Sequence, residues 1–329
     1  MASKLDVYQI ILGKRAGLFK DVIFKKCGIT EISPTRSKVF NAFYKKFLEQ
    51  IGGNVFCVDT KKMGLTIFKE RGQRINNVMT AHSDSYVIEG YIDGGPYDTI
   101  RKLAKLSDTS KRQTINKTDI VTDRYYIYLY LPLDSKMGVL MVQTKENSSI
   151  RRAIKPFFEA LFKTDSTKNC RINSYYPKWL KEDFLQGANL HNMSFETENI
   201  SQAQSEEEVT IETETFNVKI TITPTNDQTA ITDASNLIER IGSSFALKIG
   251  NATRYLSSFT KKKGTMKNEE QKKSLPFVID EEDNIHPVIE IDNDLTPDEN
   301  GDYGRNNLKN YCDGLLNRIK PEIYGINHA

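Results

Sequence analysis

The sequence lacks the features that mark membrane-spanning and secreted proteins. Its 329 residues contain no apolar run that approaches the roughly 18–20 residues of a membrane-spanning helix. Residues 1–19, MASKLDVYQIILGKRAGLF, have neither the continuous apolar core nor the small-residue cleavage site of a secretory signal peptide. We therefore expect a cytoplasmic protein with no membrane span.

Cysteine, histidine and tryptophan are scarce. The chain has four cysteines, four histidines and a single tryptophan, Trp179. The cysteines form no CxxC pair, and no cysteine or histidine pair has the spacing of zinc ligands. Widely spaced cysteines in a cytosolic chain are usually reduced and buried. We therefore predict free thiols, no structural metal site and no bound cofactor.

Nucleotide-binding and hydrolase motifs are also absent from the sequence. The glycine-rich segment GYIDGGP at residues 90–96 matches neither GxxxxGK[ST] nor GxGxxG, and its proline has no backbone N–H to offer a phosphate. The His82-Ser83-Asp84 triplet is accompanied by no GxSxG nucleophile motif. The sequence therefore does not predict ATP binding, dinucleotide binding or triad hydrolysis.

Charge is present in quantity, and its two signs are separated along the chain. Residues 1–182 contain 32 Lys and Arg against 18 Asp and Glu, whereas residues 183–329 contain 14 against 25. The net charges are +14 and −11, and the sum over the whole chain is +3. Such asymmetry favours a polyanionic partner for the basic half. The alternative is a pair of solvated surfaces that attract each other across a domain interface.

Apolar periodicity predicts strands and helices in both halves. In the first half, strands are predicted at residues 5–12, 54–59, 65–69 and 85–93, and a helix capped by Ser33 at residues 33–51. The polar, basic segment 98–123 is expected to be a flexible loop. The second half predicts acidic strands after residue 189, a helix at 233–249, a basic loop at 261–273 and a final helix at 303–319.

These elements predict an α+β protein with two domains. The first is a basic domain at residues 1–182 with a mixed sheet and covering helices. The second is an acidic, antiparallel α+β domain at residues 183–329, suited to interaction or dimerisation. Two domains also agree with the usual domain size of roughly 150 residues.

The most strongly patterned segment is residues 125–162. It predicts a strand, a tight turn at residues 134–138, a nearly continuous apolar strand and an amphipathic helix at residues 148–162. Tyr126, Tyr128 and Tyr130 share one face of the first strand. If that face is open, the three rings can stack on bases, as in proteins that bind single strands. The alternative is that the tyrosines pack against a helix.

The same hairpin carries a spacing with catalytic potential. Asp134 precedes a strand that ends with Gln143 and Lys145, and this resembles the hairpin of the PD-(D/E)xK nucleases. In that family the carboxylates hold Mg²⁺ and the lysine steadies the attacking hydroxide. The sequence departs from the pattern, because Gln is a weaker neutral ligand and no earlier helical Glu supplies a third ligand. The alternative is an ordinary hairpin whose Asp closes a turn and whose Lys is solvated.

Basic side chains make the stronger case for function. We predict that they converge on one surface and bind phosphates without sequence specificity, in a salt-sensitive manner. The start of the helix at residues 148–162 adds free amides that suit a phosphate. The predicted nucleic-acid-binding residues are Lys45, Lys46, Arg101, Lys102, Lys111, Arg112, Arg151, Arg152 and Lys155.

A family resemblance extends this prediction. The order of an N-terminal strand, a helix, hairpins and then YYIYLYLPLDSKMGVLMVQTKENSSIRRAIKPFFEAL resembles the RexA-type phage-exclusion proteins. The likeness covers mainly the first half of the chain. It implies a protein that binds double-stranded DNA as a homodimer and acts in antiphage defence by abortive infection. It also implies that the turn at Asp134 is architectural.

Three functions are therefore predicted as alternatives. The first is a DNA-binding protein of antiphage defence, without enzymatic activity. The second is a Mg²⁺-dependent nuclease that uses Asp134, Gln143 and Lys145. The third is an adaptor whose acidic half binds another protein of the same defence operon.

Overall fold

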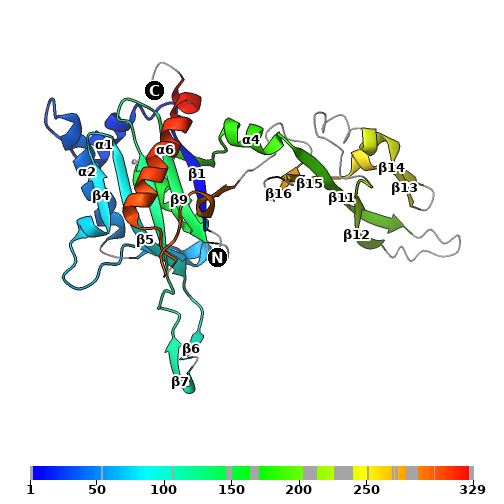
Figure 1. The fold of residues 1–329 in the computed structure, drawn as a ribbon, viewed down its shortest axis with the longest axis horizontal. Coiled ribbons are helices and arrows are strands. Elements are labelled where there is room, and N and C mark those ends of the chain that lie inside the picture. Colours follow the sequence, from blue (N-terminus) through cyan, green and yellow to red (C-terminus); the bar gives the residue numbers. More distant parts are fainter. Residues whose placement is uncertain are drawn as a thin grey trace. The chain divides into compact units, whose positions relative to one another are not determined.

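The protein has an α+β fold composed of two compact units (Figure 1). Unit 1 comprises Met1–Tyr175 and Val288–Ala329, and unit 2 comprises Tyr176–Pro287. The computed structural model describes residues 3–52, 55–105, 107–145, 150–163, 170–202, 213–225, 240–249, 252–268, 270, 273–278, 288–299 and 301–325. Among the described helices, none combines the length and the hydropathy that crossing a membrane requires.

The two units do not follow the predicted division at residue 182. The chain leaves unit 1 close to that position but returns at Val288, so unit 1 is built from two separate segments. The returning segment ends in helix α6 (Arg305–Tyr324), whose buried stripe includes Leu308, Cys312 and Ile319. That stripe is visible in the sequence, but the sheet that it covers lies far earlier in the chain.

The charge asymmetry keeps its sign when it is counted by unit. Unit 1 has 34 Lys and Arg against 25 Asp and Glu, and unit 2 has 12 against 18. The net charges of the two units are therefore +9 and −6, smaller in magnitude than the +14 of residues 1–182 and the −11 of residues 183–329. The difference arises because the acidic residues after Val288 belong to the basic unit.

A large antiparallel sheet forms the centre of unit 1. Its strand order is β10-β1-β9-β8-β5-β3-β2, with β17 also pairing with β1 and β4 with β5. The strands are β1 (Ser3–Leu12), β2 (Phe56–Val58), β3 (Met63–Thr66), β4 (Met79–His82), β5 (Val87–Pro96), β8 (Asp123–Tyr130), β9 (Met137–Lys145), β10 (Cys170–Ser174) and β17 (Ile289–Glu290). All of these pairings are antiparallel, so the sheet is not mixed as predicted. The nearly continuous apolar strand predicted after the turn is β9, and it lies between β1 and β8 in the interior of the sheet.

Helices cover both faces of this sheet (Figure 1). On one face, α1 (Phe19–Cys27), α2 (Arg36–Ile51) and α3 (Arg151–Phe162) enclose the main hydrophobic core. The Phe43 ring stacks on Phe162 with 5.5 Å between centroids, and this joins α2 to α3. Helix α6 packs on β8 and β9 on the other face.

Two features of this layer differ from the sequence prediction. The cap of α2 is Thr35, whose side chain accepts a hydrogen bond from the Lys38 N–H, rather than Ser33. Helix α1 covers a segment in which no helix is predicted from the sequence, and it ends at Gly28 in the left-handed conformation.

Unit 2 contains a four-stranded antiparallel sheet in the order β12-β11-β15-β16. Its described elements are α4 (Lys178–Leu185), β11 (Ala188–Gln202), β12 (Thr213–Ile222), β13 (Ala246–Ile249), β14 (Ala252–Tyr255), β15 (Lys261–Asn268) and β16 (Lys273–Val278). The predicted basic loop at 261–273 is wrong in its first part, because Lys261 pairs with Glu196 of β11 in a regular register. Of the predicted helix at 233–249, residues 240–244 are helical and residues 246–249 form strand β13, whereas residues 233–239 lie outside the described residues.

Candidate nucleic-acid interface

A two-stranded ribbon extends from unit 1 (Figure 1). Among the described strands, β6 (Arg101–Lys105) and β7 (Asp108–Ile115) pair only with each other, in a sheet separate from the main one. The segment predicted as a flexible loop is therefore a hairpin. Polar and charged residues dominate it, and strand pairing of this kind depends on backbone hydrogen bonds rather than on a buried face.

The base of the ribbon is held by backbone and side-chain contacts. The Asp98 N–H donates to the Lys117 carbonyl at 3.0 Å, and Lys62 forms an ion pair with Asp98 at 3.1 Å. The Tyr97 hydroxyl donates to Asp59 at 2.6 Å, and this hydrogen bond raises the pKa of Tyr97 to about 12. These contacts connect the base of the ribbon to the segment between β2 and β3.

The ribbon is strongly basic. Residues 101–117 contain six Lys and Arg and one Asp. Within the described part of the chain, neither Arg101 nor Lys102 has an acidic partner, and both are exposed. An exposed cation without a neighbouring carboxylate keeps its full charge for a phosphate.

The two faces of the ribbon differ in character. Residues opposite each other in an antiparallel pair lie on the same face, and faces alternate along each strand. The register places Lys102 opposite Thr114 and Ala104 opposite Arg112 on one face. On the other face, Arg101 is opposite Ile115 and Leu103 is opposite Gln113. Leu103 is 58% exposed, so one face is polar and basic and the other includes apolar surface.

The start of α3 lies at the same end of the sheet as the base of the ribbon. A Cβ atom at Gly94, near the end of β5, would lie only 2.6 Å from the Cγ2 atom of Ile150, the residue before α3. Lys145 at the end of β9 pairs in register with Ser3 at the start of β1. The antiparallel register therefore brings the ribbon and the first turn of α3 to one end of unit 1.

Only part of the predicted α3 cluster is available to a ligand. Arg151 binds the carboxylate of Asp6 on β1 through its Nε and Nη2 atoms. The Lys155 Nζ lies 5.4 Å from the centre of the Tyr8 ring. Arg152 is exposed and has no acidic partner in the described residues. Of these three cations, Arg152 is therefore the best suited to contact a phosphate.

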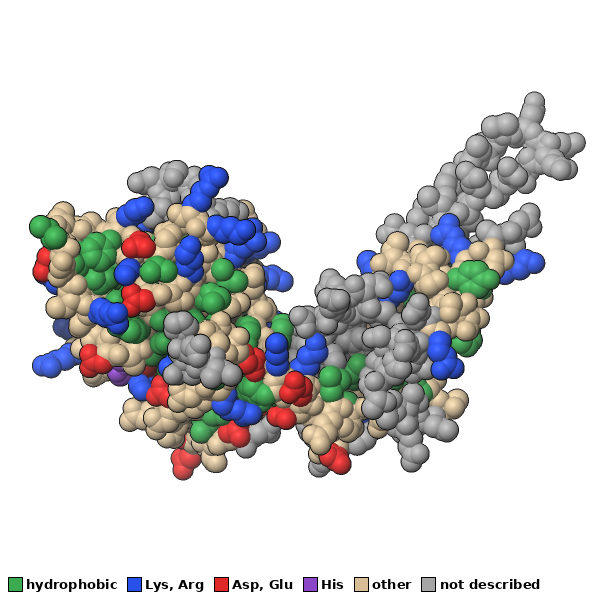
Figure 2. Space-filling view, turned by 90° about the horizontal axis from the view of Figure 1, so that it is seen from above, with side chains coloured by type: hydrophobic (Ala, Val, Ile, Leu, Met, Phe, Trp, Pro, Cys, Tyr) green, Lys and Arg blue, Asp and Glu red, His purple; other side chains and the backbone are tan. Residues whose placement is uncertain are grey.

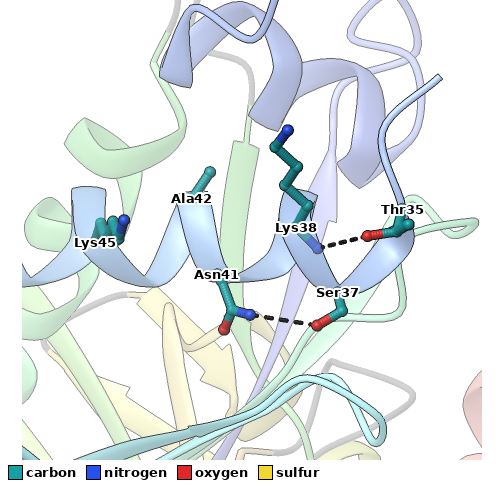
Figure 3. Close-up of a pocket in the computed structure, with 6 residues that line it drawn as sticks. All are labelled: Thr35, Ser37, Lys38, Asn41, Ala42 and Lys45. Carbon is teal, nitrogen blue, oxygen red and sulfur yellow. Dashed lines mark hydrogen bonds between the residues drawn. The ribbon is translucent and has the colours of Figure 1, made fainter. Parts of the chain in front are cut away.

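Lys45 and Lys46 lie elsewhere, on α2. A shallow depression of about 450 Å³ follows this helix and is lined by Thr35, Ser37, Lys38, Asn41, Ala42 and Lys45 (Figure 3). Figure 3 shows the Lys38 side chain on one edge of α2 and the hydrogen bond from Asn41 to Ser37 on the other edge.

Acidic residues offset most of the positive charge near this depression. Lys38 pairs with Glu31, Lys46 pairs with Glu49 at 3.0 Å, and Arg36 pairs with Asp134 at 2.7 Å. Surface pairs of this kind leave little net field. The α2 surface is therefore a weaker candidate for a polyanion than the ribbon.

No protein-family model matches the chain, and no curated protein sequence matches it. The resemblance to RexA-type proteins therefore stays a prediction. Function has to be inferred from the geometry and charge of the chain itself.

The basic character of unit 1 is not confined to the ribbon. In the view of Figure 2, Lys and Arg side chains gather along one side of unit 1, whereas Asp and Glu side chains are scattered over it.

Lys111 and Arg112 both belong to β7, so the ribbon contains four of the nine predicted binding residues. Those four are Arg101, Lys102, Lys111 and Arg112.

The structure does not bring the predicted nuclease residues together. Asp134 lies in the β8–β9 turn, where it binds Lys20 at 3.1 Å and Arg36 at 2.7 Å. Gln143 is buried near the far end of β9, where it accepts from the Tyr126 N–H and donates to the Ser3 hydroxyl. Gln143 lies six positions after Met137 along β9, which corresponds to roughly 20 Å at about 3.3 Å per position.

That separation is too long for a shared metal ion. Mg²⁺ holds its ligands at about 2.0–2.1 Å, so two ligands of one ion lie within roughly 4 Å of each other. Among the described residues, no group of three or more His, Cys, Asp or Glu side chains is placed to hold a metal. Asp134, Gln143 and Lys145 therefore do not form a single site.

The tyrosine stripe of β8 is not an open stacking surface. Tyr126 and Tyr128 are buried, and their hydroxyls donate to Glu89 at 3.0 Å and to Asp313 of α6 at 2.5 Å. Tyr130 is partly buried beneath Lys320, whose Nζ lies 4.9 Å from the ring centre. The alternative prediction, that these rings pack against a helix, is confirmed.

A buried ionic cluster beside this stripe was not predicted. Glu89 of β5 is 3% exposed and receives Arg305 of α6 through two nitrogens, at 2.7 and 3.0 Å. His82 lies 3.3 Å from the same carboxylate, so the His82-Ser83-Asp84 triplet provides a contact to Glu89 rather than a triad. Burial raises the pKa of the Tyr126 hydroxyl, which stays protonated at neutral pH. In the sequence, the feature that could have indicated this cluster is Glu89, an acidic residue within the apolar strand SYVIEGYID.

Proposed function

We propose that this protein binds double-stranded DNA without sequence specificity, through the β6–β7 ribbon and the start of α3. The observation that carries the proposal is the exposed ribbon, in which residues 101–117 have six Lys and Arg and one Asp. Two-stranded β-ribbons bind DNA with their strands in the major or the minor groove. The phosphates on both sides of a groove attract a positively charged element that enters it.

The charge of the surrounding unit supports a polyanion. Unit 1 has a net charge of +9, and Arg152 lies at the same end of the sheet as the base of the ribbon. Long-range attraction of this sign raises the rate at which DNA encounters the protein. The contacts involve charges and phosphates rather than base edges, which is why we propose binding without sequence specificity.

The biological setting rests on resemblance alone. From the resemblance to RexA-type proteins, we propose that the DNA binding serves a cytoplasmic antiphage system of the abortive-infection type, with a homodimer as the active form. An adaptor role for the acidic unit 2 is compatible with this setting. The nuclease alternative has no assembled metal site in the described residues to support it.

The proposal is tested by DNA binding over a salt series. We expect the affinity of the wild-type chain for a labelled duplex to fall linearly with the logarithm of the salt concentration. The double variant Arg101→Ala/Lys102→Ala should bind more weakly, with a slope smaller by about 0.9 for each phosphate that the protein no longer neutralises.

A matched control removes two charges from the other basic surface. Lys45→Ala/Lys46→Ala changes the net charge by the same amount but alters α2, where acidic residues offset the charge. Its slope should stay close to that of the wild-type chain. The proposal fails if the wild-type chain does not bind, if salt has no effect, or if the α2 variant loses as much affinity as the ribbon variant.

A further inference from the structure

The apolar part of the ribbon needs a partner. Leu103 is 58% exposed and Ile100, just before β6, is 63% exposed. A lone two-stranded hairpin is at best marginally stable in water, so a partner that covers its apolar side chains would stabilise it. The face that includes Leu103 also includes Arg101, Gln113 and Ile115.

The charge of the ribbon decides which partner fits. A second copy of the chain would bring another ribbon with six cations and one Asp against this one, and the two would repel each other. DNA instead offers phosphates to the cations and apolar base-pair surfaces to Leu103. Nucleic acid therefore satisfies both the charge and the apolar surface of the ribbon, whereas a second ribbon satisfies only the apolar surface.

The composition of this face matches a known mode of groove binding. Proteins that bind the minor groove use Arg, Lys, Asn or Gln to follow it, and they insert apolar side chains such as Leu or Ile between base pairs. Arg101 and Gln113 are of the first kind, and Leu103 lies directly opposite Gln113. Lys102 and Arg112, on the outward face, have side chains long enough to reach the phosphates of the groove walls.

We propose that the β6–β7 ribbon enters the minor groove with its Arg101/Leu103/Gln113/Ile115 face and inserts Leu103 between neighbouring base pairs, so that binding bends the DNA. This inference rests on the proposed DNA binding. It adds the groove, the inserted residue and the deformation of the partner. Insertion of this type bends a duplex by about 20–90°.

The test separates bending from affinity. A duplex of about 30 base pairs carries a donor and an acceptor fluorophore at its ends, and energy transfer is measured with the full chain at saturation. We expect transfer to rise when the wild-type chain binds. Leu103→Ala should lose at least half of that rise while its Kd increases less than about tenfold.

The matched control lies on the opposite face of the same strand. Lys102→Ala should weaken binding, yet at saturation its energy transfer should equal that of the wild-type complex. Because Leu103 and Lys102 are both exposed, both variants should melt at the wild-type temperature, and a melting curve checks this.

Four results would overturn the inference. If the wild-type chain binds DNA and leaves it straight, or if Leu103→Ala bends it fully, insertion is wrong although the proposed DNA binding stands. If sedimentation without DNA shows that Leu103→Ala converts a dimer into a monomer and the DNA stays straight, the apolar face contacts a second copy instead. If the wild-type chain binds no DNA at all, both proposals fail.

Discussion

Two hairpins of unit 1 have the same antiparallel pairing and opposite surroundings. In the β8–β9 hairpin, Leu129 and Leu140 pair in register and neither is exposed to solvent. In the β6–β7 ribbon, Leu103 pairs with Gln113 and is 58% exposed. Backbone pairing alone therefore does not decide whether a hairpin becomes a core or an arm. Side chains decide it, because only β8–β9 has apolar residues on both faces for the helices to cover.

The largest expected effect concerns the ion pair that holds α6 over the buried hairpin. Arg305→Ala leaves the Glu89 carboxylate, whose side chain is 4% exposed, without its cation. Removing one partner of a buried pair costs about 3–5 kcal/mol of unfolding free energy. Urea unfolding should show this loss.

A double variant checks the cause of that loss. Glu89→Gln/Arg305→Met removes both charges, so it should be more stable than Arg305→Ala. If Arg305→Ala unfolds at the wild-type urea concentration, the pair does not hold α6 in place.

The second prediction compares one leucine from each hairpin. Leu129→Ala should lower the unfolding free energy by about 2–5 kcal/mol, because it opens a cavity in a filled core. Leu103→Ala should change it by no more than about 0.5 kcal/mol, because the side chain is mostly solvated. Thermal melts of the two variants beside the wild-type chain measure the difference. Equal shifts would show that the ribbon is packed in solution.

The third prediction uses Tyr126 and Tyr128 of β8, because strands β6 and β7 contain no tyrosine. Burial raises the pKa of Tyr126 and of Tyr128, and the hydrogen bonds to Glu89 and Asp313 raise them further. In the unfolded chain both titrate near pH 10. The folded state thus holds protons that the unfolded state releases, so stability present below about pH 10 is lost as the pH rises above it.

The size of this alkaline effect is about 1.4 kcal/mol per pH unit for each tyrosine above pH 10. The unfolding free energy measured between about pH 9 and pH 11 should therefore fall steeply. Tyr128→Phe is the control, since it removes one of the titrating hydroxyls and should reduce the slope. An unchanged slope in Tyr128→Phe would show that Tyr128 ionises alike in both states.

The smallest effect is expected at the turn of the buried hairpin. Asp134→Ala breaks two ion pairs that are exposed to solvent, so it should cost no more than about 1 kcal/mol. Plasmid DNA incubated with Mg²⁺ should show no difference between the wild-type chain, Asp134→Ala and Lys145→Ala. Cleavage by the wild-type chain that is lost in both variants would restore the nuclease alternative.

The local elements of this protein follow from its sequence alone. The apolar stripe of α2, the alternation of β8 and the continuous apolar run of β9 each involve residues that are neighbours in the chain, and all three elements are present. The basic residues of the ribbon could also be predicted from the sequence, because they are close together in the chain. Local periodicity depends only on the geometry of one helix or strand.

Which of those residues are available to a partner depends on the tertiary structure. Arg151 meets Asp6 of β1, and Tyr126 meets Glu89 of β5, through contacts between residues far apart in the chain. Asp134 and Gln143 are close in sequence, but a straight strand keeps them apart. Helix α6 belongs to the C-terminal part of the chain, yet it packs on β8 and β9 of the sheet. None of these contacts can be predicted from the spacing of residues in the sequence, because each depends on which surfaces meet when the whole unit folds.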